Sequence, residues 1–318
     1  MVGPVNGVLL SIERDDRAVL ALTGGDRVRF LHGMVTNDIK RLTTGRGCRA
    51  ALLSQKGRFV ADLVVYARPD ELWIETDRST FDKVAAILEQ HIIADDVELE
   101  DRRRTLALHA IYAFGGALPI AVDPEAPYAI RDHEGLVVAG TRELGVPGLR
   151  LFVPTGERAN ATASAALARL LATTTPLGKD ELEMKRIEAG TPRYGFDMDE
   201  ERLFLEAGIE DAVSYDKGCY LGQEVVVRAQ SRGQLNRRLV GLLFDETHPD
   251  APLPERGAKL ASSDRPEAGF VTSTTFSTTL GRQIGLGYVH RTAWTPGTVL
   301  QCGSRSATVS ALPIVRHA

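Results

Sequence analysis

The chain has 318 residues, of which 43% are hydrophobic and 25% are charged, and its formal net charge is −4. These values are typical of globular proteins with a sizeable core, and the length suits two or three domains. No apolar stretch approaches the roughly 20 residues needed to span a bilayer, so we expect no membrane association. The acidic balance also argues against direct nucleic-acid binding, which requires clustered positive charge.

The N-terminal residues lack the basic segment and apolar stretch of a secretory signal, and we therefore expect a cytoplasmic protein. The three cysteines, Cys48, Cys219 and Cys302, lie far apart in the sequence. Their spacing indicates neither a disulfide framework nor a CxxC metal site. We expect no resident metal ion, and a monomer is the starting assumption.

The first third of the chain predicts a mixed α and β region. Short apolar segments at residues 8–12 and 18–22 are typical of strands, and a helix is expected over 28–35, after Asp26 as its N-cap. Two more strands, 50–53 and 59–66, flank a four-residue connector of the kind found in hairpins. Asp62 lies within the second of these strands, where the outward face of a strand is its simplest explanation.

Residues 72–171 predict a ferredoxin-like unit in two halves. The first half is a strand at 72–76, a helix at 81–91 and strands at 97–99 and 106–112. The second half is a pair of strands, 136–139 and 149–153, followed by an alanine-rich helix at 161–171. We therefore expect a ferredoxin-like subdomain over about residues 70–172.

A further helix is predicted over residues 180–189, with Asp180 as its cap and Gly190 at its end. Glu188 then lies in the last helical turn, where the macrodipole disfavours negative charge by a few tenths to about 1 kcal/mol. A positive or N–H-donating partner should compensate. Arg186 or Arg193 would do so as a plain ion pair, and a bound group with two N–H donors would do so better.

The last 80 residues change to short apolar segments separated by glycine and proline, which indicates a small antiparallel barrel or sandwich. We expect an α+β region over residues 1–238, made of two intertwined subdomains, and a β-barrel domain over 239–318.

One stretch combines a cation, two glycines, a thiol, a phenol, an amide and a carboxylate within eight residues. Its members are Lys217, Gly218, Cys219, Tyr220, Leu221, Gly222, Gln223 and Glu224. The glycines allow positive φ or close backbone approach, which favours a turn that presents Cys219 and Tyr220 to a surface or cleft. A buried thiol that acts as a small hydrophobe is the alternative interpretation. The clustered unlike polar groups favour recognition or chemistry.

This motif resembles the signature of the YgfZ family, folate-binding proteins of iron–sulfur cluster assembly and repair that share a fold with the aminomethyltransferase of the glycine cleavage system. The resemblance covers nearly the whole chain, and its weaker matches lie at residues 36–38, 55–58, 186–190 and 234–241. It implies an aminomethyltransferase-like folate-binding fold with a ferredoxin-like subdomain and a C-terminal antiparallel β-barrel.

The resemblance also implies a folate site. Asp62 matches an aspartate that lies beside the reactive nitrogens of folate in the aminomethyltransferases, although those enzymes usually carry a pair and Ala61 stands in front of it here. Glu188 matches the glutamate that grips the pterin ring. We expect Arg228 and Tyr220 to be further contacts of tetrahydrofolate or a one-carbon derivative, with Cys219 and Asp62 as the reactive residues. Arg228, Arg232, Arg237 and Arg238 form a basic set that suits the glutamate tail or an acidic partner.

Three functions follow, in decreasing order of support from the sequence. The first is a tetrahydrofolate-dependent accessory role toward iron–sulfur client proteins, with Lys217 favouring the Cys219 thiolate and with indirect effects on tRNA modification. The second is a folate-dependent aminomethyltransferase or other one-carbon transferase, with Asp62 steering a proton. The third is a thiol enzyme that uses a histidine such as His248 or His290. Whether the protein is an enzyme stays open, because one of the two expected carboxylates is missing.

Overall fold

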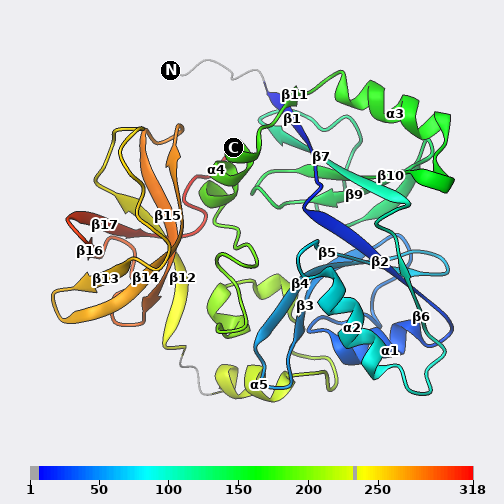
Figure 1. Ribbon diagram of the computed structural model, residues 1–318, viewed down its shortest axis with the longest axis horizontal. Helices are drawn as coiled ribbons and strands as arrows, with labels where there is room; N and C mark the ends of the chain where they lie inside the picture. The colour runs from blue at the N-terminus through cyan, green and yellow to red at the C-terminus, as the bar shows by residue number, and fades with distance from the viewer. Residues whose placement is uncertain (1–6, 232–234, 318) are drawn as a thin grey trace.

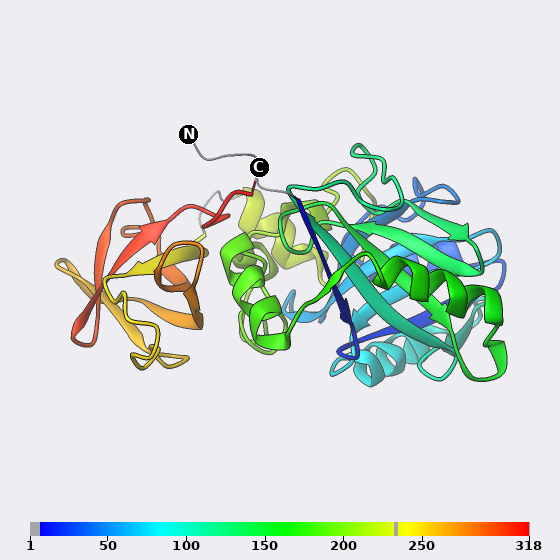
Figure 2. The same cartoon turned by 90° about the horizontal axis from the view of Figure 1, so that it is seen from above.

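Three β-sheets organise the chain in the computed structural model, which describes residues 7–231 and 235–317 (Figure 1). Two of the sheets are open and the third is a closed barrel. The barrel lies on one side of helix α4 (Lys179–Ala189) and the open sheets lie on the other, in both views (Figures 1 and 2). Arg232 and Gln234, which belong to the sequence predictions, lie outside the described residues.

The first open sheet has the strand order β3-β4-β5-β2-β6 and is antiparallel throughout. Its strands are β2 (Arg17–Thr23), β3 (Gly47–Leu53), β4 (Phe59–Ala67), β5 (Leu72–Asp77) and β6 (Glu98–Asp101). Helices α1 (Arg27–Met34) and α2 (Phe81–His91) cover one face, where their apolar side chains pack with Leu63 and Val65. Alternation along β4 leaves Asp62, Val64 and Tyr66 on the other face.

The second open sheet has the order β11-β1-β7-β10-β9-β8. Its strands are β1 (Val8–Glu13), β7 (Leu106–Phe114), β8 (Ile130–His133), β9 (Leu136–Thr141), β10 (Gly148–Pro154) and β11 (Thr175–Pro176). Helix α3 (Ala161–Leu171) covers its outer face through Ala163 and Ala166. Its inner face packs against the first sheet, with Phe152 between Tyr66 and Trp73.

The predicted ferredoxin-like unit over residues 70–172 is divided between these two sheets. Strand β5 pairs with β2 and β4, whereas β7 pairs with β1 and β10. The local pattern predicted the other strands and helices of this segment but missed β8, and β1 and β2 each pair with a different part of it. The result is two sheets packed face to face in place of one ferredoxin-like sheet.

Helix α4 and the segment after it connect the sheets to the barrel. α4 ends at Gly190, which has φ +72°, as predicted for a glycine cap. Short helices η2 (Phe204–Ala207) and η3 (Glu210–Ala212) follow. Helix α5 (Gln223–Ser231) begins directly after Gly222, where the sequence predicted only a turn. Ile187 on α4 packs against Leu239 and Tyr288 of the barrel.

The C-terminal region is a closed six-stranded antiparallel barrel, which confirms the prediction. Its order is β12-β15-β14-β13-β16-β17. The strands are β12 (Arg237–Phe244), β13 (Lys259–Ser262), β14 (Arg265–Ser277), β15 (Arg282–His290), β16 (Val299–Cys302) and β17 (Arg305–Ser310). Among the described residues, no helix is long and apolar enough to cross a membrane.

Candidate functional site

A cavity of about 220 Å³ lies between the facing sheets, beside helix α4. Its lining contains seven arginines and seven carboxylates, so the formal charges of its walls cancel. The arginines are Arg14, Arg17, Arg49, Arg142, Arg150, Arg186 and Arg193, and the carboxylates are Asp16, Asp62, Glu75, Asp77, Glu143, Glu183 and Asp211. Such a surface suits a polar ligand that carries both hydrogen-bond donors and acceptors.

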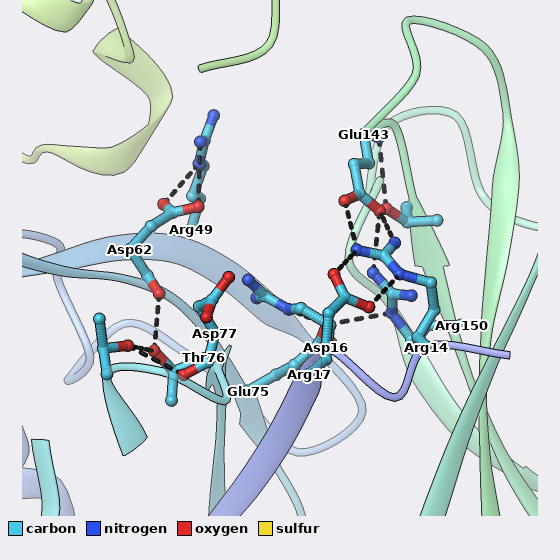
Figure 3. Close-up of polar contacts among 12 residues, drawn as sticks. Arg14, Asp16, Arg17, Arg49, Asp62, Glu75, Thr76, Asp77, Glu143 and Arg150 are labelled. Atoms are coloured by element: carbon cyan, nitrogen blue, oxygen red, sulfur yellow. Dashed lines mark hydrogen bonds and ion pairs between the residues drawn. The ribbon is translucent and has the colours of Figure 1, made fainter. Parts of the chain in front are cut away.

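Glu143 holds the deeper wall of the cavity together (Figure 3). Its carboxylate accepts hydrogen bonds from Arg14 at 2.5 and 2.9 Å, from Arg150 at 3.0 Å and from the Tyr112 hydroxyl at 2.8 Å. Burial alone would raise the pKa of Glu143, but the two guanidinium groups outweigh it and hold that pKa well below its usual range. The wall therefore stays charged, and the Glu143 carboxylate accepts four hydrogen bonds.

Glu75 continues this network across the first sheet. Arg17 Nε donates to its carboxylate at 3.0 Å, the Tyr66 hydroxyl donates at 3.0 Å, and Arg150 Nε lies 3.1 Å away. Glu75 is only 1% exposed, and the neighbouring arginines lower its pKa against the opposing effect of burial. The two sheets are thus joined by ion pairs as well as by their apolar core.

Asp62 lies on the opposite wall, where Arg49 binds it with two parallel hydrogen bonds (Figure 3). Arg49 Nε donates to one carboxylate oxygen at 2.9 Å and the guanidinium Nη2 donates to the other at 3.1 Å. A second carboxylate, Asp211, lies 3.8 Å from the same guanidinium and accepts a hydrogen bond from Tyr128. Each Asp62 oxygen keeps a free lone pair that can accept an N–H donor from a ligand.

Ala61 does not mark a lost cavity carboxylate. Its side chain belongs to the core beneath α1 and α2, on the face of β4 opposite to Asp62. Successive strand residues point to opposite faces, so a carboxylate at position 61 would point away from the cavity. The sequence argument that a missing second aspartate weakens transfer chemistry therefore loses its basis.

Glu188 lies outside this cavity, so the structure does not bring it together with Asp62. Its carboxylate is fully buried between α4 and the barrel, where Ser277 donates at 2.6 Å and Lys185 at 3.1 Å. These groups, together with His317 at 3.7 Å, supply the compensation expected near a helix C-terminus. Leu182, Glu183 and Arg186 are the α4 residues that line the cavity.

The cysteine motif forms a separate surface. Cys219 is exposed, while Tyr220 is packed in the core between the β3–β4 hairpin and η2. Lys217 is buried and donates to the carbonyl oxygens of His32 at 2.5 Å, Val35 at 2.6 Å and Asn37 at 2.9 Å. The ammonium group therefore caps the end of α1. Lys217 was expected to stabilise the Cys219 thiolate, but in the structure its ammonium group has this structural role instead.

Gly222 fixes the turn against the hairpin tip. It has φ +80°, and a Cβ at this position would lie 2.4 Å from the carbonyl oxygen of Ser54. Both the left-handed conformation and the close approach require glycine. Gln223 and Glu224 begin α5 beside it, after Gly218 and the exposed thiol.

Arg228 pairs with Glu224 along α5, with a hydrogen bond of 2.5 Å, and lines an open groove with Gln223 and Tyr220. Neither Arg228 nor Tyr220 lines the central cavity. Arg237 and Arg238 lie over Phe270 and Trp294 of the barrel. The residues predicted from the motif thus occupy a different part of the surface from Asp62.

The sequence interpretation missed Arg49, Glu75, Glu143 and Arg150. Arg49, Glu75 and Arg150 interrupt apolar strands, as Asp62 does, and this interruption is the sequence signal that could have found them. Among the described residues, neither His248 nor His290 hydrogen-bonds Cys219; their partners are Asp250, by way of its backbone N–H, and Thr292. No group of three or more His, Cys, Asp or Glu side chains within the described ranges is placed to hold a metal ion.

Two family models match the chain. Residues 16–112 match the GCVT N-terminal domain, and residues 237–316 match the glycine cleavage T-protein C-terminal barrel domain. An aminomethyltransferase from Rubrobacter xylanophilus is 31% identical, over 85% of this chain and 73% of that protein. An aminomethyltransferase from Chlorobium chlorochromatii is 29% identical, over 92% of this chain and 83% of that protein.

A solved structure has the same fold. The glycine cleavage system aminomethyltransferase T from Bartonella henselae superposes with a TM-score of 0.83 at 18% identity, over 98% of this chain and 87% of that one. A putative chloroplastic transferase from Arabidopsis thaliana is 24% identical over 97% of this chain and 76% of its own. The sequence-based resemblance is confirmed in its aminomethyltransferase part, and membership of the YgfZ family stays a prediction.

Proposed function

We propose, from the premise that this chain belongs to the aminomethyltransferase family, that it binds a reduced folate in the central cavity and transfers a one-carbon unit carried by that folate. The observation that carries the proposal is the Asp62–Arg49 pair, a carboxylate fixed by two hydrogen bonds in a charge-balanced cavity. Its remaining lone pairs face space that a ligand can fill.

The proposed transfer requires only a few side chains of this protein. Asp62 would accept an N–H of the ligand and hold the proton at the reacting nitrogen, while Arg49 keeps the carboxylate in one orientation. Arg142, an exposed lining residue without an acidic partner among the described residues, suits an anionic tail at the cavity mouth. The facing sheets would exclude water from the ring.

Calorimetric titration of tetrahydrofolate into wild-type protein, Asp62→Asn and Glu188→Gln tests the proposal. We expect Asp62→Asn to weaken binding by about tenfold or more, since a charge-assisted hydrogen bond is lost. Glu188→Gln is the matched control, because Glu188 is a buried carboxylate that lies outside the cavity. No binding by the wild type, or a greater loss in Glu188→Gln than in Asp62→Asn, would contradict the proposed site.

A second candidate, the iron–sulfur accessory role, rests on the exposure of Cys219 within the turn that Lys217 anchors. An accessible thiolate can bond iron in a client protein or attack an electrophile. Its test is the activity of iron–sulfur enzymes, including those that modify tRNA, in cells that carry only Cys219→Ser. Lost enzyme activity with intact folate binding would support this role, and unchanged activity would exclude it.

A further inference from the structure

A second carboxylate of the cavity lies on the strand next to Asp62. The β4–β5 pairing ends with Leu63 opposite Thr76, and continuing this register by one residue places Asp62 opposite Asp77. Side chains at directly opposed positions share a face, with Cβ atoms about 4.5–5.5 Å apart. Both residues line the cavity, and the Asp77 carboxylate lies between Asp62 and Arg17 (Figure 3).

Asp77 has no arginine partner within the described part of the chain, unlike Asp62 and Glu75 on the same sheet. Its Oδ1 accepts hydrogen bonds from the backbone N–H of Ser79 at 2.8 Å and from the Ser79 hydroxyl at 2.6 Å. Within residues 7–231 and 235–317 it forms no ion pair with a lysine, arginine or histidine. Its neighbour Arg17 uses Nε for Glu75. Oδ2 is therefore the acceptor that this wall leaves for a ligand.

We propose that Asp77 contacts the ligand and accepts an N–H donor of the folate ring through Oδ2, next to the acceptor that Asp62 provides. The inference rests on the proposed function. Asp62 faces the reacting nitrogen in the proposed function, and the ring of a reduced folate carries further N–H donors that a neighbouring carboxylate can accept. Asp77 would thus fill the role that the sequence assigned to Glu188, which lies outside the cavity.

The alternative role for Asp77 is purely local. Its Oδ1 closes the turn that leads into α2, a common use of aspartate at the start of a helix. Asparagine keeps this acceptor but replaces the free carboxylate oxygen with an amide NH2 group, which cannot accept a hydrogen bond from the ligand. Asp77→Asn therefore separates ligand contact from turn formation. Ser79→Ala does the reverse, because it removes one bond of the turn and keeps the charge.

The experiment is calorimetric titration of tetrahydrofolate into wild type, Asp77→Asn and Ser79→Ala, with the melting temperature of each protein as a check on folding. We expect Kd to rise about 10- to 100-fold in Asp77→Asn and less than about threefold in Ser79→Ala, at similar melting temperatures. If Asp77→Asn fails to fold, Asp77→Ser serves in its place, since serine also closes such turns.

Two results would overturn the inference and spare the proposed function. One is an Asp77→Asn protein that binds as wild type does while Asp62→Asn loses affinity. The other is an equal loss in Ser79→Ala and Asp77→Asn, which would assign the effect to the turn. Absence of binding by wild-type protein would instead remove the folate site itself, and the role of Asp77 with it.

Discussion

The central cavity and the cysteine turn differ in how their side chains are held. Side-chain ion pairs shape the cavity, and its acidic groups Asp62, Glu75 and Glu143 each contact at least one arginine. The turn is held by backbone, with Lys217 on three carbonyl oxygens and Gly222 against the hairpin tip. Substitution of a cavity residue should therefore affect charge and ligand binding together, whereas substitution in the turn should affect local order and the thiol.

The largest effect is expected from Glu143→Gln in the cavity wall. The change leaves Arg14 and Arg150 buried beside each other without their shared carboxylate, and breaking a buried ion pair in this way costs about 3–5 kcal/mol. The free energy of unfolding, measured in urea, should fall accordingly. Glu134→Gln, at an exposed ion pair, is the control and should change stability by less than about 0.5 kcal/mol. Equal stabilities would show that Asp16 and Glu75 alone suffice to compensate the two guanidinium groups.

The accessibility of the thiols distinguishes the turn from the core. Cys219 is exposed, Cys302 is buried, and burial raises the pKa of the Cys48 thiol to about 12. At pH 8 we expect Cys219 to react with an alkylating reagent about a hundredfold faster than the other two, because reaction requires an accessible thiolate. Labelling followed by mass spectrometry reads out each site. Rapid labelling that persists in Cys219→Ser would place the reactive thiol elsewhere.

Lys217→Met should loosen the turn and lower the free energy of unfolding moderately. Three hydrogen bonds from a charged donor are lost, and the carbonyl oxygens at the end of α1 are left without their partner, so we expect destabilisation of about 2–3 kcal/mol. Hydrogen exchange of residues 214–222 should accelerate more than that of the cavity strands. Lys40→Met, an exposed control nearby, should leave both measurements unchanged. Uniform acceleration across the protein would mean that the turn does not open on its own.

The smallest effect is expected from lowering the pH, which should reduce the free energy of unfolding gradually. The pKa values of Glu143 and Glu75 are lowered in the folded protein, so the unfolded chain binds more protons once the pH falls to the ordinary glutamate range. The contribution of these two carboxylates to the free energy of unfolding is therefore complete above about pH 4.5. It is lost as the pH falls further, by at most about 1.4 kcal/mol per pH unit for each group. Glu143→Gln should flatten this slope between pH 5 and 3. An unchanged slope would assign acid sensitivity to other carboxylates.

Local patterns made much of the fold predictable. The β3–β4 hairpin, helix α4 with its Gly190 cap, and the strand-rich barrel all follow from spacing within short segments. Long-range pairing could not be predicted in this way, and the ferredoxin-like unit was therefore wrong. No local pattern says that β1 and β2 join different sheets.

The residues of the candidate site also differ in whether a local pattern or long-range strand pairing identifies them. Asp62 was singled out because the family resemblance places it beside folate, but its partner Arg49 and its neighbour Asp77 come from strands whose register the sequence does not contain. Ala61 was misread because a linear motif does not show that adjacent strand residues face opposite sides. The cavity is therefore a product of strand register, while the cysteine motif, contiguous in sequence, was visible at once.

The sheet edges also bear on how this protein avoids self-association. The barrel has no edge, since its strands close on themselves, so exposed strand edges belong to the two open sheets. The outer edge of β3 is occupied by residues 35–37, which bond Arg49, Ala51 and Leu52. Strand β11 has two residues, and β6 carries three acidic side chains among four. Neutralising those acids would remove the charges that guard β6 against strand addition, so aggregation through this edge should increase in such variants or at low pH.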